Sequence, residues 1–236
     1  MLELLSNRVR VAWRTSVRLR QGSGEISQEI ARSDGTIARM TSEAPTGAWL
    51  FRYRSFLPVP LALILLLVRA GEIDGVALMA SGALIVFCGQ VLRLWAVRHI
   101  GTISRTRTTR YGPLMTAGPY AVVRNPLYVG NWLLWTGFAV WSRLLWMLPV
   151  AWFVFFLQYR AIAGWEATFI RSKYPDTYDQ YARDVRAWVP RWPPREALAA
   201  VAPLHPWREV FFSERGTLIA VAVMAILLTS KYVIVN

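Results

Sequence analysis

The sequence predicts an all-α, polytopic membrane protein with about five transmembrane helices. Hydrophobic residues make up 55% of the 236 residues, and they gather in runs that approach or exceed the thickness of a bilayer. The chain nevertheless has a net charge of +13, with its basic residues lying between the apolar runs. Basic side chains in that position are typical of cytoplasmic loops and of contacts with anionic phospholipid head groups. We therefore do not expect nucleic-acid binding.

Five apolar segments are expected to form the helices. They are residues 49–68, 76–96, 126–141, 144–159 and 217–235. At ~1.5 Å per residue, the last is long enough for ~30 Å of hydrocarbon. The third and fourth are near the lower limit, and we expect them to form a tight antiparallel hairpin.

The charge distribution predicts the orientation. Residues 97–125 carry five arginines and no acid, and residues 160–215 carry nine basic side chains, whereas the turn at 69–74 and the turn at Arg143 are short and nearly neutral. The positive-inside rule then places the N-terminus and both basic regions in the cytoplasm, with Asn236 outside. The expected regions are a basic N-terminal arm (1–48), helices one and two (49–96), a core (97–195), and a connector with the C-terminal transmembrane helix (196–236).

The arm and the scarce metal-binding residue types add further expectations. Leu2–Leu19 is either a basic amphipathic helix on the membrane or part of a disordered tail, and no signal peptide is expected. Cys88 is the only cysteine, and His99 and His205 are far apart. We therefore expect no disulfide within the chain and no metal site.

Residues 111–130 contain more specific sequence than a connecting loop requires. Their two Gly-Pro dipeptides fix the backbone and leave amide groups available to a ligand. Asn125 and Pro126 are the expected N-cap and first residue of the third helix. Tyr128 and Gly130 then lie on its first turn, where glycine allows a helix or a ligand to approach closely. The same pattern also fits a well-capped helix start without a ligand.

Glu166 is the second candidate. It follows Arg160 on the expected extension of the fourth helix, and no other acid lies within nine residues of it. A lone carboxylate near the hydrocarbon boundary is costly unless it is paired, so it is a functional candidate. The alternative is a salt bridge with Arg160 or a loop arginine. Tyr174, Tyr178 and Tyr181 fit one face of an interfacial helix and are interpreted as membrane anchors.

Together these stretches resemble the isoprenylcysteine carboxyl methyltransferase and phospholipid methyltransferase superfamily of membrane enzymes. Its members carry Leu-Val-Thr-x-Gly-x-Tyr and Arg-His-Pro-x-Tyr-x-Gly, then paired glutamates, Phe-Gly-x-x-Tyr-x-x-Tyr and a segment ending in proline. The corresponding residues here are Leu114–Tyr120, Arg124–Gly130, Glu166, Tyr174–Tyr181 and Val185–Pro190. Asn125 and Gly112 replace histidines of the prenylcysteine branch, and only one of the paired glutamates is present.

The resemblance implies methyl transfer from S-adenosylmethionine to a lipophilic acceptor at the cytoplasmic membrane interface. It implies a cofactor pocket formed by the loop before the third helix and the extension of the fourth. The expected cofactor-binding residues are Leu114, Met115, Thr116, Tyr120, Arg124, Asn125, Tyr128 and Glu166. Glu166 and Arg160 are the expected catalytic residues, Glu166 because an amine acceptor must lose a proton.

Several alternatives stay open at this stage. The acceptor is a phospholipid-type amine, slightly favoured by Asn125, or a prenylated thiol or carboxylate, or a small hydrophobic metabolite. Sterol reductases resemble the same superfamily while using a nicotinamide cofactor, although they are usually much larger. A non-catalytic membrane scaffold whose arginines bind anionic lipid is the alternative from another class.

Overall fold

The computed structural model describes residues 45–54, 56–68, 75–101, 114–192 and 204–233. The chain divides into the units Met1–Pro45 and Thr46–Asn236, and apart from Pro45 the described residues belong to the second. The predicted helix at Leu2–Leu19 and the Gly112-Pro113 turn lie outside the described residues.

The described residues form eight helices and no strand, which confirms the all-α class. The helices are α2 (Pro45–Tyr53), α3 (Val59–Leu67), α4 (Gly75–Ile100), α5 (Pro119–Val122), α6 (Pro126–Trp141), α7 (Met147–Lys173), α8 (Pro175–Asp184) and α10 (Trp207–Val233). Within the described part of the chain, three helices are long and apolar enough to cross a membrane. These are Val76–Ile100, Met147–Lys173 and Trp207–Tyr232, as expected of a multi-pass membrane protein.

The first apolar segment differs from the prediction of one helix over residues 49–68. It forms the two short helices α2 and α3, because Pro58 and Pro60 interrupt the helical hydrogen bonding between them. Pro58 is the N-cap of α3, and proline also occupies its first turn. At nine residues, α3 is shorter than the hydrocarbon core is thick.

The tightest packing in the unit joins α4 and α6, which run antiparallel. A Cβ atom on Gly82 would lie 2.6 Å from the carbonyl oxygen of Gly137, and one on Gly89 would lie 2.9 Å from that of Gly130. Small residues at such crossings let two backbones approach closely in a membrane, where burial of apolar surface alone does not drive association. The predicted close approach at Gly130 is confirmed, and the approaching element is α4.

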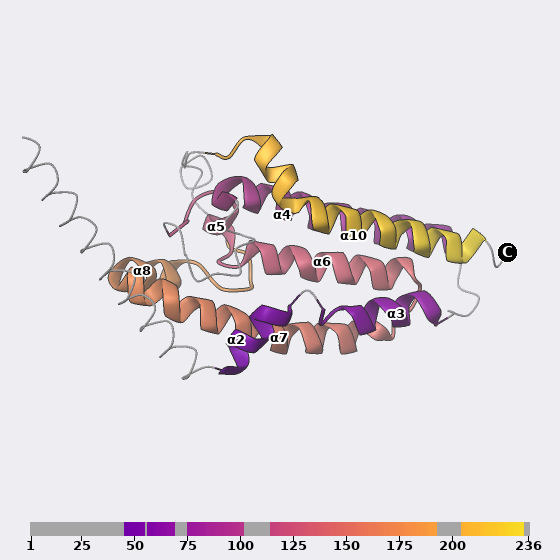
Figure 1. Cartoon of the computed structure of the whole chain (residues 1–236), viewed down its shortest axis with the longest axis horizontal. Helices are drawn as coiled ribbons and strands as arrows, with labels where there is room; N and C mark the ends of the chain where they lie inside the picture. Colours follow the sequence, from indigo (N-terminus) through magenta and orange to yellow (C-terminus); the bar gives the residue numbers. More distant parts are fainter. Residues whose placement is uncertain (1–44, 55, 69–74, 102–113, 193–203, 234–236) are drawn as a thin grey trace, which may run out of the picture. The chain divides into compact units, whose positions relative to one another are not determined.

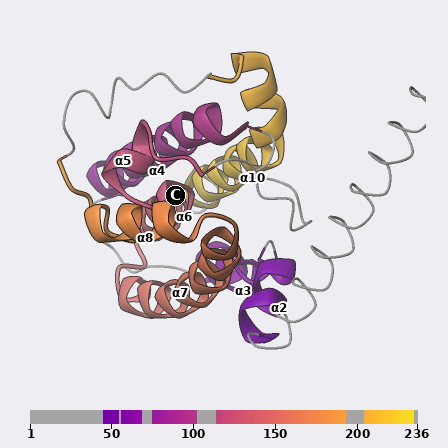
Figure 2. The same cartoon turned by 90° about the vertical axis from the view of Figure 1, so that its left-hand side faces the viewer.

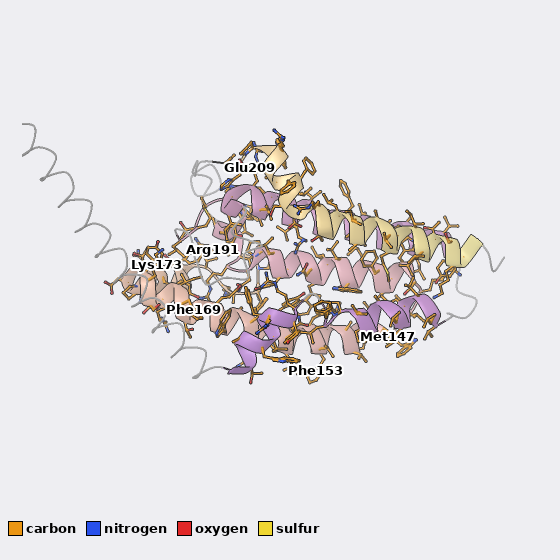
Figure 3. All side chains as sticks on the ribbon, viewed as in Figure 1. Met147, Phe153, Phe169, Lys173, Arg191 and Glu209 are labelled. Carbon is orange, nitrogen blue, oxygen red and sulfur yellow. The ribbon has the colours of Figure 1, made fainter. Side chains whose placement is uncertain are left out.

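The remaining long helices pack around this pair. Helix α10 lies beside α4 and also contacts α3, while α7 packs along α6 (Figure 1). Figure 3 shows Phe153 of α7 pointing away from the bundle, and its side chain is 65% exposed. Other large apolar side chains on α4 and α10 are exposed in the same way, including Phe87 and Ile226. Such surfaces suit lipid rather than water.

The fourth segment continues past its apolar part, as predicted. Helix α7 runs to Lys173, and Pro175 then starts α8. After α8 the chain returns along residues 120–125, where Arg124 N–H donates to the Arg186 carbonyl at 3.0 Å. Figure 2 looks onto this end, where α5 and α8 lie nearest the viewer. The two stretches singled out in the sequence therefore meet at one end of the helices.

Candidate active site

A cavity of about 290 Å³ lies where these stretches meet. Its size is at the lower end of the range for small-molecule sites, roughly 300–1,000 Å³. Seven of the predicted site residues line it, namely Leu114, Met115, Tyr120, Arg124, Asn125, Arg160 and Glu166. Thr116 is exposed and does not line the cavity, and Tyr128 reaches it through Glu166.

Tyr128 and Glu166 form the central contact of the site. The Tyr128 hydroxyl group donates a hydrogen bond to Glu166 Oε2 at 2.8 Å, joining α6 to α7. The alternative expectation was a salt bridge from Glu166 to Arg160 or to a loop arginine. Within the described residues Arg160 instead lies exposed at the cavity wall, and the Glu166 carboxylate accepts a hydrogen bond from Tyr128.

Aromatic rings hold Tyr128 in place. Its ring stacks on that of Tyr159, with centroids 4.8 Å apart and an interplanar angle of 18°. Trp188 lies on a further side, with centroids 6.5 Å apart. Such ring contacts restrict the position of the Tyr128 side chain in addition to its hydrogen bond. The Tyr128 hydroxyl group therefore points at Glu166 from a fixed position.

Asn125 begins α6 as predicted, but its side chain does not cap the helix. Pro126 follows it, and the amides of Tyr128 and Val129 donate to its backbone carbonyl at 3.1 Å. The side-chain amide instead donates to the Ala187 carbonyl at 3.2 Å. Asn125 thus ties the start of α6 to the returning segment after α8, and it lines the cavity from there.

Tyr178 and Tyr181 are not the interfacial anchors that their spacing suggested. Both are buried on α8 and line the cavity. The Tyr181 hydroxyl group donates to the Tyr120 carbonyl at 2.7 Å, and Arg124 donates to the Tyr178 hydroxyl group at 3.3 Å. Their i, i+3 spacing, continued by Val185, could have indicated this burial, because it fits an amphipathic helix that covers a core equally well.

Small residues of α7 form a cavity wall that the sequence analysis did not single out. Ala163, Gly164 and Ala167 lie on the same side of the helix as Arg160 and line the cavity. A Cβ atom on Gly164 would meet no described atom within 4 Å. Their i, i+3, i+4, i+7 spacing from Arg160 could have identified this face.

Two buried hydrogen-bond donors belong to residues that line the cavity. The Tyr120 hydroxyl group and Arg124 Nε are buried, and neither has a hydrogen-bond partner among the described residues. Burial raises the pKa of Tyr120 above its ordinary value, so the phenol stays protonated and can donate. Buried donors are normally satisfied, so two unsatisfied ones beside a carboxylate fit a ligand with both acceptor and cationic groups. S-adenosylmethionine has these groups.

Comparison with known proteins identifies the family of the segment that carries the site. Residues 77–177 match the phospholipid methyltransferase family. This segment belongs to that family. The match contains Tyr120, Arg124, Tyr128 and Glu166, and it confirms the predicted resemblance to the membrane methyltransferase superfamily. Helix α10 and most of α8 lie outside it.

Two known proteins are similar in sequence. The nickel-cobalt-cadmium resistance protein NccN of Alcaligenes xylosoxydans xylosoxydans is 28% identical over 159 residues, which cover 64% of this chain and 71% of that protein. The cobalt-zinc-cadmium resistance protein CzcN of Cupriavidus metallidurans is 35% identical over 114 residues, covering 48% of this chain and only half of that protein. No solved structure matches the chain significantly. Among the described residues, no three His, Cys, Asp or Glu side chains gather as a metal site would require.

Proposed function

We propose that the protein is an S-adenosylmethionine-dependent methyltransferase that acts on a lipophilic acceptor at the membrane interface. A phospholipid-type amine is the favoured acceptor, since residues 77–177 belong to the phospholipid methyltransferase family. The observation that carries the proposal is the cavity lined by Arg124, Tyr120 and Glu166, with the Glu166 carboxylate held by a hydrogen bond from Tyr128. A scaffold that only binds lipid would not need these groups together.

Cavity residues of different charge would bind different groups of the cofactor. S-adenosylmethionine, when bound, supplies an electrophilic methyl group next to a positive sulfur. Arg124 would hold its carboxylate, Glu166 its amino or ribose groups, and the Tyr120 hydroxyl group a further acceptor atom. Leu114 and Met115 would pack against the adenine. The aromatic ring of Tyr120, which lines the cavity, would favour a nearby cation by roughly 0.5–2 kcal/mol.

Proton removal is the second task of the site. An amine acceptor is nucleophilic only after it has lost a proton, and Glu166 is the acidic side chain that lines the cavity. The hydrogen bond from Tyr128 holds the carboxylate in one orientation, so that one oxygen remains for the acceptor. Arg160, at the exposed wall, is the proposed contact for an anionic part of the acceptor.

Little covalent help is needed for methyl transfer, so alignment and exclusion of water provide most of the catalysis. Apolar side chains such as Ile170 and Trp188 line much of the cavity. The small wall at Ala163 and Gly164 leaves room there for an apolar chain. A lipophilic acceptor can thus place its polar end beside Glu166.

We further propose that five segments span or enter the membrane, with the active site on the cytoplasmic side. The arginine-rich loop at 97–125 supports this orientation by the positive-inside rule. The test is thiol labelling of Arg107→Cys in a Cys88→Ser background. Labelling by a membrane-impermeant reagent is expected only after the cells are opened, and labelling in intact cells would overturn the orientation.

The central experiment titrates the purified protein with S-adenosylmethionine and, separately, with NADPH. Binding of the first alone supports a methyltransferase, binding of NADPH would support a reductase, and binding of neither would support a scaffold. Glu166→Gln should then lower donor affinity or turnover at least about tenfold, or about 1.4 kcal/mol, in a folded protein. Glu209→Gln, which changes an exposed acid of α10, is the matched control. If Glu166→Gln transferred methyl groups at the wild-type rate, Glu166 would have no role in the site.

The acceptor and the physiological role need a second experiment. Lipids extracted from cells with and without the gene should differ by methyl groups on a phospholipid amine. The names of the two relatives add a physiological expectation, namely that cells lacking the gene tolerate nickel, cobalt or cadmium less well. Restoration of tolerance by the wild-type gene but not by Glu166→Gln would link that role to the site.

A further inference from the structure

A buried ion pair joins α4 to α10 next to the site without lining the cavity. Arg93 Nε donates to Glu214 Oε2 at 3.0 Å, and Arg93 Nη2 donates to Oε1 at 3.0 Å and to Oε2 at 2.8 Å. Both residues are buried, Glu214 to within 1% of complete burial. Charges inside apolar helices are costly, and those that occur there commonly serve a specific function.

The other side of the same guanidinium group leads towards the active site. Arg93 Nη1 donates to Asn131 Oδ1 at 2.6 Å. Asn131 lies on α6, three residues after Tyr128. The Tyr159 ring stacks on Tyr128, 4.8 Å away, whose hydroxyl group donates to Glu166. These contacts run from α10 through α4 to the first turns of α6, where Tyr128 donates to Glu166 at the cavity.

We infer that Glu214, Arg93 and Asn131 are positioning residues that hold Tyr128, and through it the Glu166 carboxylate, in the orientation required for methyl transfer. This inference rests on the proposed function for the role of Glu166. Glu214 lies on α10, outside the family segment 77–177, so the inference gives this helix a part in positioning the site.

The local packing of α4 and α6 is adapted to this arrangement. A Cβ atom on Gly130 would lie 2.5 Å from Arg93 Cγ, so only glycine leaves space for the arginine to pass α6. Arg93 Nη1 also lies 3.4 Å from the Leu127 carbonyl, one residue before Tyr128. The guanidinium group thus contacts the first turn of α6 both through its backbone and through Asn131.

An ion pair that merely joined two helices would affect stability alone, so a matched control is needed. Lys231 provides it, because its Nζ donates to the Leu65 and Val68 carbonyls at 2.8 and 2.5 Å. It ties α10 to α3 at a distance from the cavity. Lys231→Met therefore removes a comparable link from the same helix without touching the series of contacts.

The first measurement is independent of activity. The protein is labelled with 3-fluorotyrosine, and the Tyr128 signal in the fluorine NMR spectrum is assigned with Tyr128→Phe. Glu214→Gln is nearly isosteric and remote from Tyr128, yet it should shift or broaden that signal. Lys231→Met should leave it unchanged. An unchanged Tyr128 signal in folded Glu214→Gln would overturn the inference.

The second measurement is steady-state methyl transfer. Glu214→Gln and Asn131→Leu should each lower kcat/KM about fivefold or more, whereas Lys231→Met should retain the wild-type value. If Glu214→Gln does not fold, Asn131→Leu decides, because it leaves the Arg93–Glu214 pair intact. Wild-type kinetics in folded Asn131→Leu would overturn the inference. If the wild type binds no S-adenosylmethionine but the Tyr128 signal responds to Glu214→Gln, the proposed function fails while the positioning of Tyr128 stands.

Discussion

Helices α4 and α6 meet at two glycine pairs that look alike in sequence but differ in what surrounds them. At Gly82 and Gly137 backbone packs on backbone, and the neighbours are apolar. At Gly89 and Gly130 the space next to the glycine admits the side chain of Arg93, which is bound to Asn131 and Glu214. At the first pair, glycine thus lets the two helices pack closely together. At the second pair, it makes room for a polar network.

The difference separates stability from function. The apolar crossing fixes how closely the two helices approach, and neither Gly82 nor Gly137 lines the cavity. At the polar crossing, Arg93 contacts the first turn of α6, which carries Tyr128, and Tyr128 donates to Glu166. Changes at the first should therefore remove the fold, while changes near the second should leave a folded protein with a defective site.

The largest effect is expected at the apolar crossing. A leucine in Gly137→Leu would place its Cβ 2.7 Å from the Gly82 carbonyl oxygen, where backbone cannot yield without separating the helices. We expect no monodisperse protein after solubilisation, as judged by size-exclusion chromatography. Gly164→Ala is the matched control, since its Cβ meets no described atom within 4 Å, and helix propensity favours it by up to ~1 kcal/mol. Normal elution of Gly137→Leu would show that this crossing is not essential.

An intermediate effect is expected for Tyr128→Phe. The ring still stacks on Tyr159, but the hydrogen bond to Glu166 is lost. A neutral–charged hydrogen bond contributes about 1.5–3 kcal/mol, so turnover should fall roughly tenfold or more, while the melting temperature changes by only a few degrees. Methyl-transfer kinetics and a thermal-shift assay measure the two. A large loss of stability with normal turnover would assign Tyr128 to the core.

The smallest effect is expected at the exposed pair between α7 and α8. Arg171 and Asp179 lie 2.6 Å apart, but their side chains are 61% and 41% exposed. Exposed pairs contribute roughly 0–1 kcal/mol, and salt screens them. Asp179→Asn should therefore leave both melting temperature and turnover near wild type, in low and in high salt. A clear loss of donor affinity in this variant would mean that α8 is held in place by the pair rather than by Tyr178 and Tyr181.

Local sequence patterns were most reliable where one physical requirement dominates. Apolar length predicted the helices at 76–96 and 217–235, and the structure extends them to Ile100 and back to Trp207. The first segment was predicted as one helix because hydropathy ignores backbone chemistry, whereas its prolines divide it. Polar positions were harder to predict, because the same tyrosine spacing fits an anchor or a buried face.

By itself the sequence predicted a helical chain with several apolar helices long enough for a membrane, and it singled out the residues around Arg124 and Glu166. Composition and motif order are properties of the chain alone, so predictions based on them require no knowledge of contacts. Only the tertiary structure decided that Tyr128 donates to Glu166 and that Arg93 of α4 pairs with Glu214 of α10. Those partners are separated by 38 and 121 positions along the chain. At such separations pairing depends on how the helices pack, and no local pattern encodes that.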